Sequence, residues 1–156
     1  MVRRCMRVRA GVLLALTLAV VVAGCGGGDD HSGYVKALNK AQTELASRFT
    51  ALQSRITPTS DAAQDSKTLL AYEAAVTTTV GDLRAVDPPA GLAPLHRRFV
   101  AEVTAYGAAL RKARGELSRD DPRAILAAQG RLRSAVAATG RQLNATIQAI
   151  NRKLEG

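Results

Sequence analysis

Mostly hydrophobic side chains recur with a helical period between residues 92 and 117, and this spacing limits the folds that are open to the chain. Successive positions on one stripe are separated by alternating steps of four and three residues. They are Leu92, His96, Phe99, Val103, Tyr106, Leu110, Ala113 and Leu117. This alternation is typical of a helix that packs along its whole length against other helices. The segment therefore predicts one long amphipathic helix.

Three further segments show the same periodicity, and residues that break helices separate them. The segments are 34–56, 61–86 and 122–154. The breaks at 57–60, 87–91 and 118–122 are rich in Pro, Asp, Ser and Gly. Asp61, with Gln64 three residues later, has the pattern of a capping box. Asp121 before Pro122 has the pattern of an N-cap followed by proline at the first helical position.

Four such helices with short connections predict the fold class. We expect an all-α protein, an antiparallel up-down-up-down four-helix bundle over residues 34–156, behind a flexible N-terminal tether. The composition agrees with this fold. Aromatic residues make up only 3% of the chain and Trp is absent, and alanine suits closely packed helices better than sheets.

The first 24 residues have the pattern of a secretory signal peptide. Residues 1–10 carry four arginines and no acid, and residues 11–23 are apolar or small apart from Thr17. A membrane-spanning helix needs about 20 apolar residues, and this run is much shorter. We therefore expect residues 1–24 to be cleaved, and residues 25–33, with sequence CGGGDDHSG, to form the tether.

The sequence Val22-Ala23-Gly24-Cys25 resembles the lipobox of bacterial lipoproteins. The resemblance implies that cleavage falls between Gly24 and Cys25 and that Cys25 receives the lipid. It also implies an anchor in the cell membrane with the protein on the extracytoplasmic face. Two acyl chains give stable anchoring where one gives only marginal binding. Beyond this motif the chain resembles the small Ala/Arg-rich helical lipoproteins of actinobacterial-type bacteria, a group of unassigned function, which implies no activity.

The remaining chain offers little for catalysis. Cys5 leaves with the signal and lipid occupies Cys25, so the folded part has no free thiol and no disulfide. It contains no Glu-x-x-His pair and no His-Glu-x-x-His motif. We therefore expect no enzyme activity, no catalytic residues, no metal and no cofactor.

Two groups of residues are candidates for contacts with a partner. His96 lies on the stripe of the third helix beside the Pro-Pro break, and His96, Arg97 and Arg98 are a candidate ligand contact. The alternative is that His96 is a partly buried residue that closes the end of the core. The second group, Arg111, Lys112, Arg114 and Arg119, is a candidate site for an anionic partner.

Charge is distributed unevenly between the two halves of the mature chain. Loss of the four signal arginines lowers the formal charge from +9 to +5. Residues 25–90 hold six basic and eight acidic residues, and residues 91–156 hold twelve and five. This asymmetry suits an anionic envelope polymer, but interspersed charges are also typical of an ordinary soluble surface.

Three functions fit these observations. The first is a non-catalytic binding or interaction module held on the bilayer through acylated Cys25. The second is a structural envelope protein that associates with anionic wall polymer, with itself or with another envelope protein. The third is a carrier of a small apolar ligand. We expect no nucleic-acid partner, and the sequence leaves the oligomeric state open.

Overall fold

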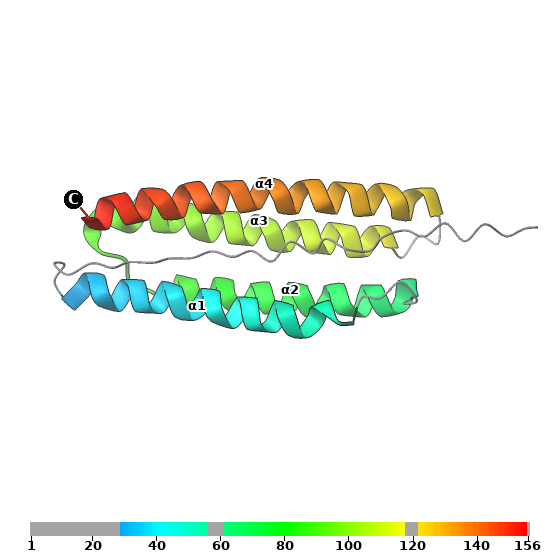
Figure 1. Ribbon diagram of the computed structural model, residues 1–156, viewed down its shortest axis with the longest axis horizontal. Coiled ribbons are helices and arrows are strands. Elements are labelled where there is room, and N and C mark those ends of the chain that lie inside the picture. Colours follow the sequence, from blue (N-terminus) through cyan, green and yellow to red (C-terminus); the bar gives the residue numbers. More distant parts are fainter. Residues whose placement is uncertain (1–28, 56–60, 118–121, 156) are drawn as a thin grey trace, which may run out of the picture.

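The computed structural model describes residues 29–55, 61–117 and 122–155, and these residues form a bundle of four helices (Figure 1). The helices are α1 (Asp29–Gln53), α2 (Ala62–Arg84), α3 (Ala93–Leu117) and α4 (Pro122–Glu155), with a short 3₁₀ helix, η1 (Ala90–Leu92), before α3. The predicted all-α four-helix bundle is confirmed. Neither Gly24 nor Cys25 lies within the described residues.

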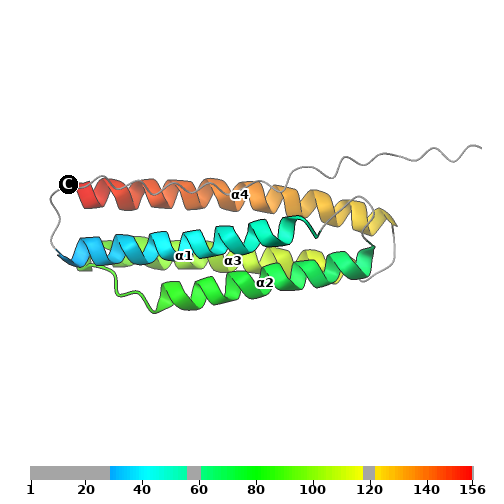
Figure 2. The same cartoon turned by 60° about the horizontal axis from the view of Figure 1, so that its bottom comes forward.

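Neighbouring helices pack in chain order. Helix α1 packs against α2, α2 against α3, and α3 against α4. The colours in Figure 1 show that the chain runs in one direction through α1 and α3 and in the other through α2 and α4, and Figure 2 shows the same alternation from another side. Contacts between α3 and α4 agree with these opposite directions. Glu102, early in α3, accepts a hydrogen bond from Thr146, late in α4, whereas Glu116, late in α3, pairs with Arg131, early in α4.

Helix α1 begins at Asp29, whereas the sequence predicted a tether up to residue 33 and a helix from Tyr34. Residues 29–33 are therefore helical. Packing of the next turn favours this early start, because Tyr34, only 2% exposed, fixes that turn against the core.

The breaks in the sequence coincide with the ends of the helices. Asp61 caps α2, because the Gln64 amide N–H donates to its side-chain oxygen at 2.7 Å. The Gln64 side chain does not complete the capping box with Asp61; it donates instead to the Arg55 carbonyl at 3.5 Å. Pro122 opens α4 as predicted, while Asp121, its predicted N-cap, lies outside the described residues.

The core consists of the predicted stripes. In α3 the buried positions include Phe99, Val103, Leu110 and Ala113, which confirms the alternating four-and-three spacing. Among the α4 side chains that the structure describes, the buried apolar ones are Leu143, Ile147 and Ile150. The rest of the buried cluster comes mainly from α1 and α2, and it consists of Tyr34, Leu38, Ala41, Leu52, Leu69, Tyr72, Val76, Val80, Leu83, Leu92 and Val100.

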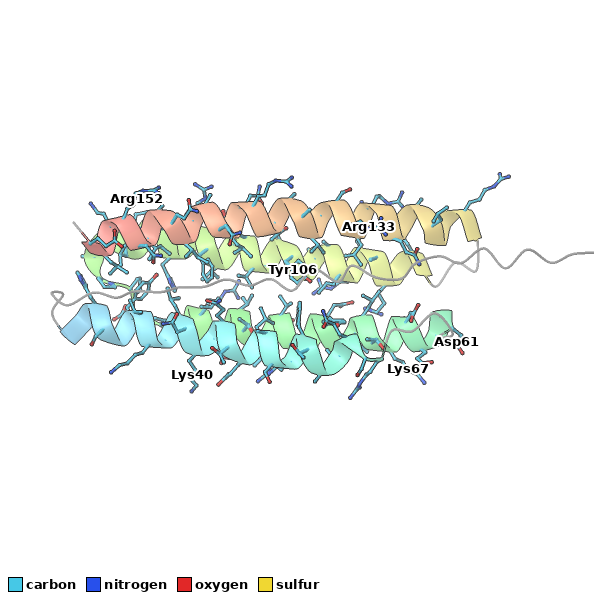
Figure 3. All side chains as sticks on the ribbon, in the orientation of Figure 1. Lys40, Asp61, Lys67, Tyr106, Arg133 and Arg152 are labelled. Carbon is cyan, nitrogen blue, oxygen red and sulfur yellow. The ribbon has the colours of Figure 1, made fainter. Side chains whose placement is uncertain are left out.

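An aromatic cluster lies in the middle of the bundle. The Phe49 ring packs edge-on against Tyr72, with 4.6 Å between ring centroids, and contacts Tyr106 at 5.8 Å. The Tyr72 hydroxyl donates to the Phe49 carbonyl at 3.2 Å. Figure 3 shows Tyr106 between the two layers of helices and Lys40 pointing away from the bundle. Three of the chain's few aromatic rings thus join α1, α2 and α3.

Helices α2 and α3 approach closely at Gly107. A Cβ atom at this position would lie 3.1 Å from Val76 Cγ1, tighter than an ordinary van der Waals contact. Val76 is only 1% exposed and has little room to move. A Cβ atom at Gly130 in α4, in contrast, would meet nothing within 4 Å.

We therefore predict opposite effects for two glycine-to-alanine substitutions. Gly130→Ala should raise the free energy of unfolding by about 0.5–1 kcal/mol, because alanine is the better helix former. Gly107→Ala should lower it by about 1 kcal/mol, because overpacking outweighs the gain in helix propensity. Urea denaturation followed by circular dichroism measures both. A Gly107→Ala variant as stable as Gly130→Ala would show that this close approach is not tightly packed.

Candidate functional site

Most of the predicted site residues that the structure describes lie near one of the two ends of the bundle. His96, Arg97 and Arg98 lie in the first two turns of α3, at the end where α1 begins. Arg111, Lys112 and Arg114 lie in the last two turns of α3, toward the opposite end. The structure does not bring the two groups together. Cys25, Gly24 and Arg119 lie outside the described residues.

His96 is buried and joins three helices. Its side chain comes from α3, and the residue is 5% exposed. The ring atom Nε2 lies 2.9 Å from the carbonyl oxygen of Leu83 in the last turn of α2. The other ring atom, Nδ1, lies 3.2 Å from the Tyr34 hydroxyl of α1, and the two rings meet edge to face.

These two contacts define the hydrogen bonding of the neutral His96 ring. A carbonyl oxygen only accepts, so Nε2–H donates to Leu83, and Nδ1 accepts from the Tyr34 hydroxyl. Burial lowers the pKa of His96, against a smaller raising effect of the Leu83 carbonyl. Burial likewise raises the pKa of Tyr34 to about 12, so the phenol keeps its proton at neutral pH. Both ring nitrogens of His96 are thus used within the bundle.

A depression of about 500 Å³ lies beside His96. It forms where α2 stops at Arg84, because Pro88 and Pro89 carry the chain onward as an extended segment into η1. The connection between α2 and η1 forms one wall of the depression, and the first two turns of α3 form the other. The lining residues are Arg84, Val86, Asp87, Pro88, Ala93, His96, Arg97 and Val100.

The three predicted ligand contacts differ in what they reach. Arg97 lines the depression, and so does His96. Arg98 instead donates from Nε to Glu102 Oε1, one turn along α3, at 2.9 Å. The same carboxylate oxygen accepts from the Thr146 hydroxyl of α4 at 3.0 Å. Arg98 therefore takes part in contacts between α3 and α4 rather than in the depression.

The basic residues late in α3 are partly engaged by a buried acid. Glu73 of α2 is 7% exposed and accepts from Arg114 Nε at 2.6 Å, and Arg111 Nε lies 3.5 Å from its other oxygen. Arg131 of α4 pairs in the same region with Glu116 of α3 at 2.9 Å. Arg111, Arg114 and Arg131 therefore form ion pairs that link neighbouring helices. Lys112 is exposed.

Sequence reasoning missed Glu73, Tyr34 and Arg84. Glu73 carried a usable signal, because it stands three residues before Val76 and seven before Val80, on the buried side of α2. Tyr34 and Arg84 carried none. Only in the folded chain does Tyr34 contact His96 of α3, and only there does Arg84 line the same depression as residues of α3.

Comparison of the chain with protein-family models, curated proteins and solved structures finds no match. Among the described residues, no group of three or more His, Cys, Asp or Glu side chains is placed to hold a metal ion.

The buried His96 predicts that stability falls as the pH falls below neutrality. Its pKa is lowered in the folded state relative to about 6.5 in the unfolded chain, so the unfolded chain binds the proton more readily. The contribution is complete above pH 6.5 and is lost as the pH falls through the lower, folded pKa. Urea midpoints between pH 7.5 and 5 should therefore decline for the wild type and less steeply for His96→Gln. Equal slopes would contradict this account.

Glu73 provides a second prediction. Glu73→Gln removes a buried charge that two arginines share, so the free energy of unfolding should fall. Glu44→Gln is the matched control, because the Glu44 contact with Lys40 is exposed and 4.0 Å long. Such surface pairs contribute about 0.5 kcal/mol or less. Urea denaturation should show a larger loss for Glu73→Gln, and equal losses would assign Glu73 no special role.

Proposed function

We propose that the chain is a lipid-anchored protein on the extracytoplasmic face of the cell membrane, and that its bundle is a non-catalytic binding or interaction module. The observation that carries this proposal is the sequence Val22-Ala23-Gly24-Cys25 directly after a short apolar run. The short run favours cleavage over a retained span, and the small residues before Cys25 suit a signal peptidase. A thiol is the strong nucleophile that alkylation by lipid requires.

The start of α1 supports a close association between the bundle and the bilayer. Asp29 lies four residues after Cys25, and four residues span at most about 14 Å. An acylated Cys25 would therefore hold the His96 end of the bundle close to the lipid headgroups. Among the described helices, none is long and apolar enough to cross a membrane.

The use of the polar side chains supports a binding module rather than an enzyme. Catalysis needs polar groups that converge on a substrate. His96 uses both ring nitrogens within the bundle, and Glu73 is shared by two arginines of α3. These side chains hold helices together, which suits a rigid scaffold that presents a surface.

A second candidate is a structural role with an anionic envelope polymer or another envelope protein. The favouring observation is the position of Lys112 and Arg133, which are exposed in the half of the bundle away from the start of α1. This half would face outward from a bilayer that holds Cys25. Pairing of Arg111 and Arg114 with Glu73 reduces the charge available there.

The lipid anchor is tested by Cys25→Ala. In a bacterial host fed a labelled fatty acid, the wild type should incorporate label and collect in the membrane fraction. The variant should incorporate none, because alanine offers no sulfur for the thioether, and should be released or remain unprocessed. Cys5→Ala is the matched control and should be labelled like the wild type. Equal labelling of the Cys25→Ala variant would overturn the proposed anchor.

A further inference from the structure

We propose that the depression between the α2–η1 connection and the first two turns of α3 binds a phosphate group. Its volume of about 500 Å³ falls within the range of small-molecule sites. It is large enough for a phosphate with a small organic group attached. The phosphate belongs either to a lipid headgroup or to a soluble compound, and the chemistry that recognises it is the same.

Two arginines from different helices line this depression. Arg84 comes from the last turn of α2, and Arg97 comes from the second turn of α3. Within the described part of the chain, no salt bridge engages either of them, whereas Arg98, Arg111 and Arg114 all have acidic partners. These two arginines therefore remain available for an anion.

The local charge matches a singly charged phosphodiester. Arg84 and Arg97 contribute two positive charges, and Asp87 on the same wall contributes one negative charge. His96 is neutral when its two ring nitrogens are engaged as described. The net charge of the residues that line the depression is therefore one positive charge. Asp87 also offers an acceptor for a hydroxyl group next to the phosphate, such as those of a glycerol headgroup.

The geometry favours phosphate over carboxylate. Each arginine presents parallel N–H donors that suit two oxygens of one anion. The two oxygens of a carboxylate lie in one plane, whereas the oxygens of a phosphate are arranged tetrahedrally and can meet guanidinium groups that approach from two helices. Ala93, the first residue of the 25-residue helix α3, also lines the depression, so the positive end of that helix dipole adds to the attraction.

The position of the depression connects it with the membrane. It lies at the end of the bundle where α1 begins, close to the expected lipid on Cys25. Its closeness to headgroups rests on the proposed anchor, whereas binding of phosphate by Arg84 and Arg97 does not. The test therefore uses unlipidated protein, so that failure of the anchor and failure of this site are distinguishable.

The test compares two probes on the chain from residue 25 with Cys25→Ser. This chain keeps all the described helices and their core, and its helical circular dichroism is checked first. Inorganic phosphate is titrated at low salt while backbone amide signals are followed by nuclear magnetic resonance. Co-sedimentation then compares vesicles of phosphatidylcholine alone with vesicles of equal parts phosphatidylcholine and phosphatidylglycerol.

The variant Arg84→Gln with Arg97→Gln is compared with Arg141→Gln with Arg152→Gln, which removes the same charge from exposed positions on α4. Phosphate should shift the signals of residues 84–100, and the first variant should weaken this binding by about tenfold. The second should leave it within twofold of the parent. Sodium chloride replacing phosphate at equal ionic strength should produce no such shifts.

The two probes identify the source of the phosphate. Stronger binding to the phosphatidylglycerol vesicles, lost in the Arg84/Arg97 variant alone, assigns the site to lipid headgroups. Phosphate shifts without any preference between the vesicles assign it to a soluble compound. The proposal is overturned if phosphate causes no shifts at residues 84–100, or if the control variant loses as much binding as the Arg84/Arg97 variant.

Discussion

The hydrogen bonds of His96 are the interaction on which one end of this molecule depends. The ring belongs to α3, yet it donates to the last turn of α2 and accepts from the first turns of α1. A buried polar ring is costly unless its nitrogens are paired, so the three helix ends must keep their relative positions. The depression beside His96 has one wall from the chain after α2 and one from α3, and its shape therefore follows from the same contacts.

Farther along the bundle, ion pairs hold neighbouring helices together as the His96 hydrogen bonds do at its end. Glu73 of α2 is buried and shared by two arginines of α3, and Glu116 of α3 pairs with Arg131 of α4. Part of the excess positive charge in the second half of the chain therefore stabilises the fold, because these basic residues form ion pairs with acids on neighbouring helices. Arg84 and Arg97 differ from these cations, since they line the depression and no salt bridge between described residues engages either of them.

Features governed by local sequence could be predicted, and features governed by distant contacts could not. The helices, the Asp61 cap and the buried positions Phe99 and Val103 follow from spacing and capping residues a few positions apart. The start of α1 at Asp29 was missed because it depends on the docking of Tyr34, whose partner His96 is 62 residues away. In the candidate site, His96 and Arg97 were predicted from their place beside the Pro-Pro break, whereas Arg84 joins them only where α2 meets α3.

The proposed anchor requires that Cys25 carries lipid and holds the His96 end of the bundle at the membrane. Intact-mass spectrometry of the full-length gene product, extracted from bacterial membranes with detergent, reports both the first residue of the chain and the attached lipid. We expect a chain that begins at Cys25 and carries the additional mass of a diacylglyceryl group. A chain that begins at another residue, or an unmodified Cys25 in the membrane-extracted protein, would contradict the proposed anchor.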